Sequence, residues 1–356
     1  MPIEGLQAQG KVPVVARRVF RLGLTTALTL ALAYGMGFPL PFIAPIFALM
    51  LTLPPGPPMP AKKLAVLVIA VMGILGVGLL LIRPLQFYPL TAVLLVTCGV
   101  FLASFMTVNL GKGAPATFLI VGLTLISSVG TQDWAVASGL IDGLALGLVV
   151  AILCQWVVYP FFPEEKDLPP PEPPPLTEAQ GAWTALRATA VIMPVFLLTL
   201  TNPAAYAPIV MKSVTLGQQV STVSARSAGR ELLGSTFLGG CFAIGIWFAL
   251  GISTNLWMFF LWTLLFVLYL GAKIYQVAPT RYPPSFWSNA GVTALILLGS
   301  AVQDSDTGKD VYQAFAVRMG LFLAVTLYAW LAIDLLERFR SRRLATIIPR
   351  ETGALR

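Results

Sequence analysis

Four ionisable residues stand out among those inside long apolar stretches of the sequence, where a charge is hard to accommodate. They are Asp142, Arg187, Lys212 and Arg318. An ionisable group within the hydrocarbon of a membrane is costly unless it pairs with another group or lines water, so such residues are candidates for function. A carboxylate in this setting can carry a coupling proton, and a cation can hold an anionic substrate.

Asp142 and Arg318 take equivalent places when the segment IDGLALGL is aligned with VRMGLFLA. Equivalent positions in two repeats can face each other across a pseudo-twofold axis. One interpretation is a structural ion pair that fixes the register of two helices. The other is a proton- or substrate-linked acid opposite a cation, and the sequence leaves both open.

Lys212 has no charged counterpart, because the position aligned with it is Leu49. One hypothesis gives Lys212 an anion-binding or gating role. The alternatives are that its side chain reaches to the membrane surface, or that it pairs with Glu231 or Asp142.

The segment around Lys212 is unusually polar for an apolar run. Polar stretches at membrane depth are tolerated only against protein or water. We therefore predict that this segment lines a substrate pathway, with hydrogen-bonding contributions from Thr215, Gln218 and Gln219.

The composition explains why these residues stand out. Of the 356 residues, 57% are hydrophobic and only 11% are charged, whereas soluble domains have about 25% charged residues. The net charge is +8, and the basic residues are clustered between apolar runs. This pattern is typical of membrane proteins and disfavours a nucleic-acid partner. There is no histidine and no phosphate-binding loop, so we predict neither an enzyme nor a cofactor or metal site.

Twelve segments are apolar enough to be membrane spans of about 20 residues, although the second and eighth are short or polar. They are residues 19–37, 40–53, 64–82, 90–109, 115–130, 135–159, 183–201, 204–222, 232–250, 255–272, 286–302 and 311–335. The predicted fold class is all-α, a polytopic transmembrane helix bundle of about 12 spans in two parallel six-helix repeats.

The placement of lysine and arginine predicts the topology. Between the predicted spans, the loops on one side hold only Arg83 and Lys309 and carry Asp133, Asp304, Asp306 and Asp310. The other side has most of the basic residues: Lys11, Arg17, Arg18, Arg21, Lys62, Lys63, Lys112, Lys166, Arg226, Arg230, Lys273, Arg281 and the C-terminal group from Arg338 onward. The positive-inside rule then places both termini in the cytoplasm.

Internal similarity divides the chain into two halves. Ala44-Pro45-Ile46 and Ala207-Pro208-Ile209 are each followed by a Thr-Leu pair at the same distance. Because each half has an even number of spans, both halves enter from the same side as parallel repeats. The predicted organisation is a first repeat at 1–160, a proline-rich cytoplasmic linker at 161–181, a second repeat at 182–340 and a basic cytoplasmic tail at 341–356.

One motif resembles a known family. The segment Arg230-Glu-Leu-Leu-Gly234-Ser-Thr-Phe-Leu-Gly239 is similar to the R-x-x-x-G-[ST]-x-x-x-G segment of the fusaric-acid-resistance (FUSC) family, which includes aromatic carboxylic acid exporters. The short linker departs from members with large cytosolic domains and looks like a compact branch known only as a domain of unknown function. In this comparison Arg230, Gly234, Gly239, Pro45 and Pro208 match structural positions.

The resemblance implies an inner-membrane subunit of a tripartite efflux system. Its protein partners would be a periplasmic membrane-fusion protein of the HlyD type and an outer-membrane channel. The chain would also contact the lipid bilayer, and a homo-oligomer would add a second copy of the chain. The predicted function is proton-motive-force-driven export of small, aromatic or amphipathic organic anions. The alternative is a membrane enzyme, or an assembly or scaffold factor in envelope polymer or lipid export.

Overall fold

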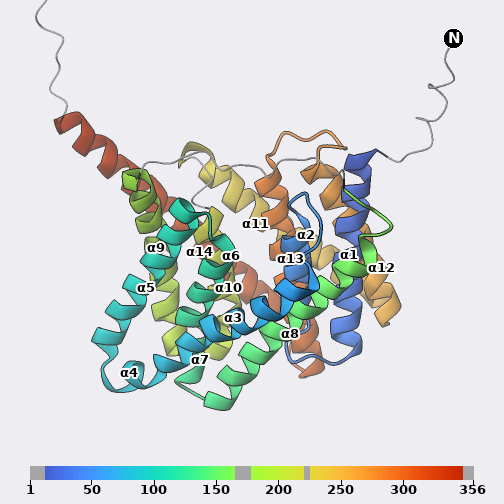
Figure 1. The fold of residues 1–356 in the computed structure, drawn as a ribbon, viewed down its shortest axis with the longest axis horizontal. Helices are drawn as coiled ribbons and strands as arrows, with labels where there is room; N and C mark the ends of the chain where they lie inside the picture. Colours follow the sequence, from blue (N-terminus) through green and yellow to red (C-terminus); the bar gives the residue numbers. More distant parts are fainter. Residues whose placement is uncertain (1–12, 165–177, 220–224, 348–356) are drawn as a thin grey trace, which may run out of the picture. The chain divides into compact units, whose positions relative to one another are not determined.

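The computed structural model describes residues 13–164, 178–219 and 225–347. In this part of the chain the regular secondary structure is entirely helical, and there is no strand. Its fourteen α-helices and one π-helical turn form twelve helices, because α4 extends α3, and η3 and α7 continue α6. In chain order (Figure 1) they are α1 (Val14–Gly35), α2 (Ile43–Thr52), α3 (Ala61–Leu80), α4 (Ile82–Phe87), α5 (Pro89–Leu110), α6 (Gly113–Val121), η3 (Gly122–Ile126), α7 (Ser127–Gly130), α8 (Trp134–Val158), α9 (Glu178–Thr201), α10 (Pro203–Gln219), α11 (Ala225–Ile252), α12 (Leu256–Ile274), α13 (Pro284–Asp306) and α14 (Val311–Ile347).

Each of the twelve predicted spans coincides with one of these helices. Among the described residues, nine helices are long and apolar enough to cross a membrane. The other three are α1, the ten-residue α2 and the seventeen-residue α10. Large apolar side chains such as Ile69, Leu80 and Leu90 lie on the surface, where lipid would cover them. The predicted fold class, a polytopic helix bundle, is confirmed.

The two short helices contain the matched prolines. Pro45 lies in the first turn of α2, where a helix needs no amide donor, whereas Pro208 lies inside α10. The proline-rich loop Pro54–Pro60 follows α2 and ends it. The short, polar second and eighth segments of the sequence therefore correspond to helices that differ from the long spans around them.

The helices form two compact units, and each unit draws on both halves of the chain. Unit 1 consists of Met1–Gly73, Ser138–Pro173 and Leu238–Phe315. Unit 2 consists of Ile74–Ala137, Pro174–Phe237 and Ala316–Arg356. Four of the boundaries between the units fall within α3, α8, α11 and α14, and the fifth falls between residues 173 and 174.

The two units have matching compositions. Unit 1 contains the first, second and sixth helices of the first half (α1, α2 and most of α8) with the third to fifth of the second half (α11, α12 and α13). Unit 2 contains the first, second and sixth helices of the second half (α9, α10 and α14) with the third to fifth of the first half. The first half thus contributes its first, second and sixth helices to unit 1, and the second half contributes the same three to unit 2. The third to fifth helices of each half belong to the other unit.

The packing inside each unit follows the same pattern. In unit 1, α1 packs against α12 and α2, and α13 packs against both α12 and α2 (Figure 1). In unit 2, α9 packs against α5 and α10, and α6 packs against both α5 and α10. Every one of these pairs has its counterpart at the equivalent place, which is the arrangement that two repeated halves would give. The predicted domain boundaries themselves stay a prediction.

Glycine lets the third helix of each half approach the fifth. A Cβ atom added to Gly78 of α3 would lie 2.0 Å from the carbonyl oxygen of Gly122 in η3. A Cβ atom added to Gly239 of α11 would lie 2.6 Å from the carbonyl oxygen of Ala290 in α13. These contacts leave no room for a side chain, so close packing depends on glycine at both places.

Candidate anion-binding site

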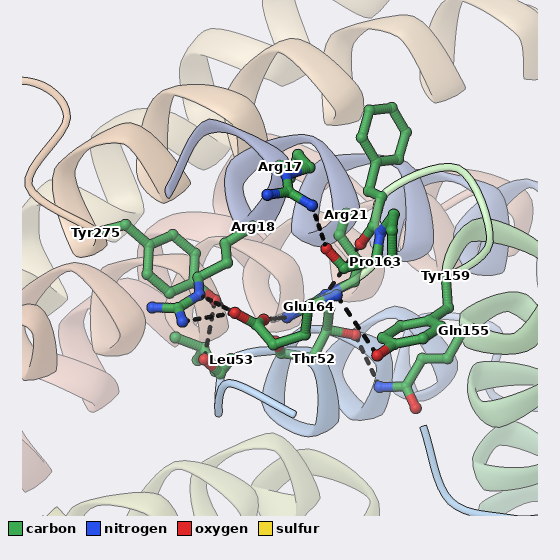
Figure 2. Close-up of polar contacts among 11 residues, drawn as sticks. Arg17, Arg18, Arg21, Thr52, Leu53, Gln155, Tyr159, Pro163, Glu164 and Tyr275 are labelled. Atoms are coloured by element: carbon green, nitrogen blue, oxygen red, sulfur yellow. Dashed lines mark hydrogen bonds and ion pairs between the residues drawn. The ribbon is translucent and has the colours of Figure 1, made fainter. Parts of the chain in front are cut away.

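Basic residues at the start of α1 hold the chain segment that follows α8. Arg18 donates from Nε and Nη2 to Oε1 of Glu164 at 2.8 and 2.5 Å, and Arg21 Nη2 donates to Oε2 at 2.8 Å. Figure 2 shows the Glu164 carboxylate between the two guanidinium groups. The side chains of Glu164 and Arg21 are only 2% and 4% exposed. Both carboxylate oxygens are thus occupied by charge-assisted hydrogen bonds.

The environment of Glu164 favours its charged form. Burial raises the pKa of this carboxyl group, but hydrogen bonds and positive charge from Arg18 and Arg21 outweigh burial and hold the pKa below its ordinary value of 4.5. The carboxylate is therefore ionised at neutral pH, where the basic groups of α1 bind it.

Backbone contacts fix the same segment to α1. Arg17 Nη1 donates to the carbonyl oxygen of Pro163 at 3.0 Å, and the rings of Phe20 and Phe162 stack with centroids 5.7 Å apart. The guanidinium carbon of Arg21 lies 5.6 Å from the centroid of the Tyr159 ring. Carbonyl, carboxylate and aromatic groups from one segment thus surround the basic end of α1.

A pocket of about 370 Å³ adjoins Arg21 within unit 1. It combines two cations, several hydrogen-bonding groups and apolar walls. Its lining residues are Arg21, Leu51, Thr52, Pro54, Pro55, Gly56, Pro57, Pro58, Met59, Pro60, Lys63, Ile152, Gln155 and Tyr159. A pocket with mostly apolar walls and a few convergent polar groups is the usual form of a small-molecule site.

Hydrogen bonds hold the walls of this pocket in place. Gln155 Nε2 donates to Thr52 Oγ1 at 2.9 Å, linking α8 to the end of α2 (Figure 2). Trp156 Nε1 donates to the carbonyl oxygen of Met59 at 2.7 Å, and the Tyr275 hydroxyl donates to that of Leu53 at 2.8 Å. The proline-rich loop is therefore anchored at both ends, and a preformed pocket lowers the entropy cost of binding.

Unit 2 has a comparable ion pair between the first and sixth helices of the second half. Arg187 of α9 donates from Nη1 to Oε1 of Glu337 in α14 at 2.9 Å, and Trp183 Nε1 donates to the same oxygen at 3.2 Å. Arg340 lies over the Trp183 ring, 5.6 Å from its centroid. In both units, an arginine on the first helix of a half thus binds a glutamate on, or just beyond, the sixth helix of that half.

Lys212 lies in α10 of unit 2 and its side chain is completely buried. The aligned Leu49 is completely buried in unit 1, so a lysine occupies in one unit the place of a leucine in the other. Helix α10 packs against η3, a π-helical turn of a kind that is often found at functional sites. Thr215 uses its hydroxyl to bond the carbonyl oxygen of Lys212 at 2.8 Å.

The other predicted site residues are placed as follows. Gln218 and Gln219 end α10, and their side chains lie outside the described residues. Asp142 is exposed on α8 in unit 1, whereas Arg318 is partly exposed on α14 in unit 2. Because these two residues belong to different units, both interpretations of the pair stay open.

The three matched residues of α11 differ in exposure. Arg230 is exposed, Gly234 is partly buried, and Gly239 is buried against α13. Arg230 and Gly234 belong to unit 2, and Gly239 belongs to unit 1. The close contact of Gly239 gives one glycine of the motif a packing role.

Sequence reasoning missed the residues around the pocket. Arg18, Arg21 and Lys63 were interpreted only as topology signals, and Glu164 only as part of a charged linker. One signal was available: Arg17, Arg18 and Arg21 have the three- and four-residue spacing that places side chains on one helix face. The pairing of that face with Glu164, far along the chain, required the structure.

The fold and this site together define a polytopic α-helical membrane protein. Residues 18–158 match the family described as "Protein of unknown function (DUF2955)", a stretch from α1 to the end of α8 that is less than half of the chain. No curated protein and no solved structure matches the chain. The matched stretch holds every pocket-lining residue except Tyr159. The resemblance to the fusaric-acid-resistance family stays a prediction.

Proposed function

We propose that this protein is a transporter subunit of a bacterial inner membrane that exports small amphipathic organic anions. The observation that carries the proposal is the pocket of unit 1, where Arg21 and Lys63 lie beside apolar walls. Two cations suit a carboxylate, and Leu51, Met59 and Ile152 suit an aromatic or aliphatic body.

The bound Glu164 supports this choice of ligand class. Arg18 and Arg21 bind its carboxylate in a buried setting, so this end of α1 accommodates an organic anion. A substrate carboxylate in the adjacent pocket would use the same guanidinium of Arg21 together with Lys63. Thr52, Gln155 and Tyr159 would add hydrogen bonds that orient the anion.

The predicted topology agrees with loading from the cytoplasm. The pocket is built from the start of α1, the loop between α2 and α3, and the end of α8. The positive-inside rule assigns all three segments to the cytoplasmic side. A substrate would therefore enter from the cytoplasm, as an exporter requires.

We assign the energy coupling of transport and the release of the substrate to groups outside this pocket. The sequence has no nucleotide-binding loop, so the proton-motive force would drive export, with Asp142 as the candidate proton carrier. The buried Lys212 in unit 2 would be a second candidate anion contact. A periplasmic membrane-fusion protein and an outer-membrane channel would complete the system, as the family resemblance implies.

Lys63 and Lys62 provide a matched test of the substrate pocket. Both are exposed neighbours on α3, but only Lys63 lines the pocket. In proteoliposomes under an imposed pH gradient, Lys63→Met is expected to raise the KM for an aromatic carboxylate about tenfold, equivalent to about 1.4 kcal/mol. Lys62→Met is expected to leave the KM unchanged, because it removes the same charge outside the pocket.

Two results would contradict the proposal in different ways. Equal KM values for both variants would remove the pocket from the transport path. Absence of gradient-driven movement of every carboxylate tested would reject transport of organic anions, and would favour the alternative role in envelope assembly.

A further inference from the structure

A second, larger pocket lies in unit 1 among residues that no step of the proposed transport uses. Its volume is about 520 Å³. The ends of α1, α11 and α13 and the starts of α12 and α14 form it: Tyr34, Trp247, Phe248, Leu250, Gly251, Thr254, Asn255, Leu256, Phe259, Val302, Ser305, Asp306 and Tyr312. The predicted topology places these helix ends on the periplasmic side.

The inner part of this pocket is apolar and aromatic. Phe259 and Leu250 are buried and form its floor. The Tyr34 ring meets Phe259 edge-on at a centroid distance of 5.0 Å. Such a floor suits an aromatic or branched apolar group, because ring edges and faces pack closely around it.

The rim of the pocket holds two exposed aromatic rings and an acid. Phe248 and Tyr312 are 60% and 64% exposed, and their centroids lie 6.4 Å apart. Asp306 is exposed beside them, and no lysine or arginine lines the pocket. Aromatic faces and a carboxylate both attract a cation and disfavour an anion.

Tyr34 adds a polar group to the pocket, and its hydrogen bonds are not satisfied within the described part of the chain. Its hydroxyl is buried and has no hydrogen-bond partner among the described residues. A buried hydroxyl without a partner is costly, so an occupant of the pocket that supplies an N–H group would satisfy it.

We propose that this pocket binds a hydrophobic organic ammonium ion. The ammonium group lies just inside the rim, where it donates hydrogen bonds to the Asp306 carboxylate above it and the buried Tyr34 hydroxyl below it, beside the rings of Phe248 and Tyr312. The apolar body fills the floor formed by Phe259 and Leu250. The site differs in charge from the pocket at Arg21, so it does not depend on the proposed anion export.

Direct binding to the full-length protein in lipid nanodiscs tests this site. The probes are naphthylethylammonium, the neutral naphthylethanol and the anionic naphthylpropanoate, with binding to empty nanodiscs subtracted. The ammonium probe is expected to bind at least about tenfold more tightly than the alcohol, since a charge-assisted hydrogen bond is lost in the neutral probe. The carboxylate is expected to bind most weakly.

Asp306→Asn and Asp310→Asn form a matched pair of variants. Asp310 directly precedes α14, accepts hydrogen bonds from the amides of Tyr312 and Gln313, and does not line the pocket. Asparagine also caps helices well, so Asp310→Asn removes a nearby charge with little effect on folding. Only Asp306→Asn is expected to lose the preference for ammonium over alcohol, and Tyr34→Phe is expected to weaken ammonium binding several-fold.

Three outcomes would overturn the proposal. The first is equal affinity of the wild-type protein for the ammonium and alcohol probes, which would indicate simple apolar partitioning. The second is an unchanged preference in Asp306→Asn, and the third is tightest binding of the carboxylate. All three are read from binding alone, so they are distinct from any failure of the transport assay.

Discussion

Arg21 connects the ion pair of unit 1 with the adjacent pocket. Its guanidinium binds Glu164, faces the Tyr159 ring and lines the pocket wall. An anion that enters the pocket therefore meets a cation whose position is already fixed by another carboxylate. Such positioning lowers the entropy lost on binding, but it also makes the affinity depend on the charge of Glu164.

The charge of Glu164 predicts a specific dependence of stability on pH. A carboxyl whose pKa lies below its ordinary value of 4.5 stabilises the fold above that pH, and this contribution is lost as pH falls through the lowered pKa. At pH 7, Glu164→Gln is expected to lower the free energy of unfolding by about 3–5 kcal/mol, because it leaves two arginines without their carboxylate. Denaturant unfolding at neutral and acidic pH measures both effects.

Glu337→Gln is the matched control for this ion pair. Glu337 forms the comparable ion pair with Arg187 in unit 2, but its side chain is 31% exposed. The loss for Glu337→Gln is therefore expected to be smaller, since exposed pairs contribute about 1 kcal/mol or less. The interpretation of Glu164 would be wrong if both variants lost the same small amount, or if Glu164→Gln kept the acid sensitivity of the wild type.

The candidate site could be predicted only in part from single residues. Lys212 was expected inside a polar segment, and its side chain is buried. The neighbours that bury it could not be predicted, because burial follows from apolar context whereas the packing of α10 against η3 brings together residues far apart in the chain. For the same reason Glu164 was interpreted as a linker residue, although it binds the basic end of α1.

At the scale of helices, one close approach in each half depends on glycine. Helix α3 meets η3 through Gly78, and α11 meets α13 through Gly239. Gly78 is buried, whereas Gly76, half a turn earlier, has no atom within 4 Å of the position that a Cβ would take. Alanine substitutions at these two positions therefore distinguish the effect of packing from the effect of helix propensity.

Gly78→Ala is expected to destabilise the protein by about 1–3 kcal/mol, because the added methyl group would force α3 and η3 apart. Gly76→Ala is expected to be neutral or stabilising by up to about 1 kcal/mol, since alanine favours a helix more than glycine does. Denaturant unfolding in detergent gives both values. A Gly78→Ala variant as stable as Gly76→Ala would contradict the close approach of α3 and η3.

The positions of the helices were largely predictable, because apolar runs of span length are a strong local signal. The twelve predicted segments all coincide with helices. The break between α3 and α4 and the π-helical turn η3 were not predicted. A π-helical turn changes the backbone by a single residue and leaves hydropathy unchanged, so no hydropathy pattern reveals it.

At the scale of the whole molecule, neither half of the chain contains a complete unit. The first half lacks α11, α12 and α13 of unit 1, and the second half lacks α4, α5, α6, η3 and α7 of unit 2. Sequence similarity between the halves suggested two bundles in succession. The exchange of helices between them could not be predicted, because both arrangements bury the same apolar faces.

Division of the chain within the predicted linker tests this exchange. Fragments covering residues 1–170 and 171–356 are each expected to be unstable and degraded when produced alone. Produced together, they are expected to accumulate and to copurify, because each supplies the helices that the other lacks. Protein abundance and copurification through a tag on one fragment measure the outcome. A single fragment that folds as a protease-resistant monomer would contradict the exchanged arrangement.

The exchange of helices between the halves also has a consequence for ancestry. A shorter ancestral protein made of one half could complete its units only as an intertwined homodimer, with two identical copies of every buried position. Joining two such halves in one gene would remove that constraint, because each unit could then change alone. Lys212 and η3 illustrate the result: unit 1 has Leu49 and the uninterrupted helix α13 at the corresponding places. A buried lysine can thus be present in one unit without a second one at the corresponding place in the other.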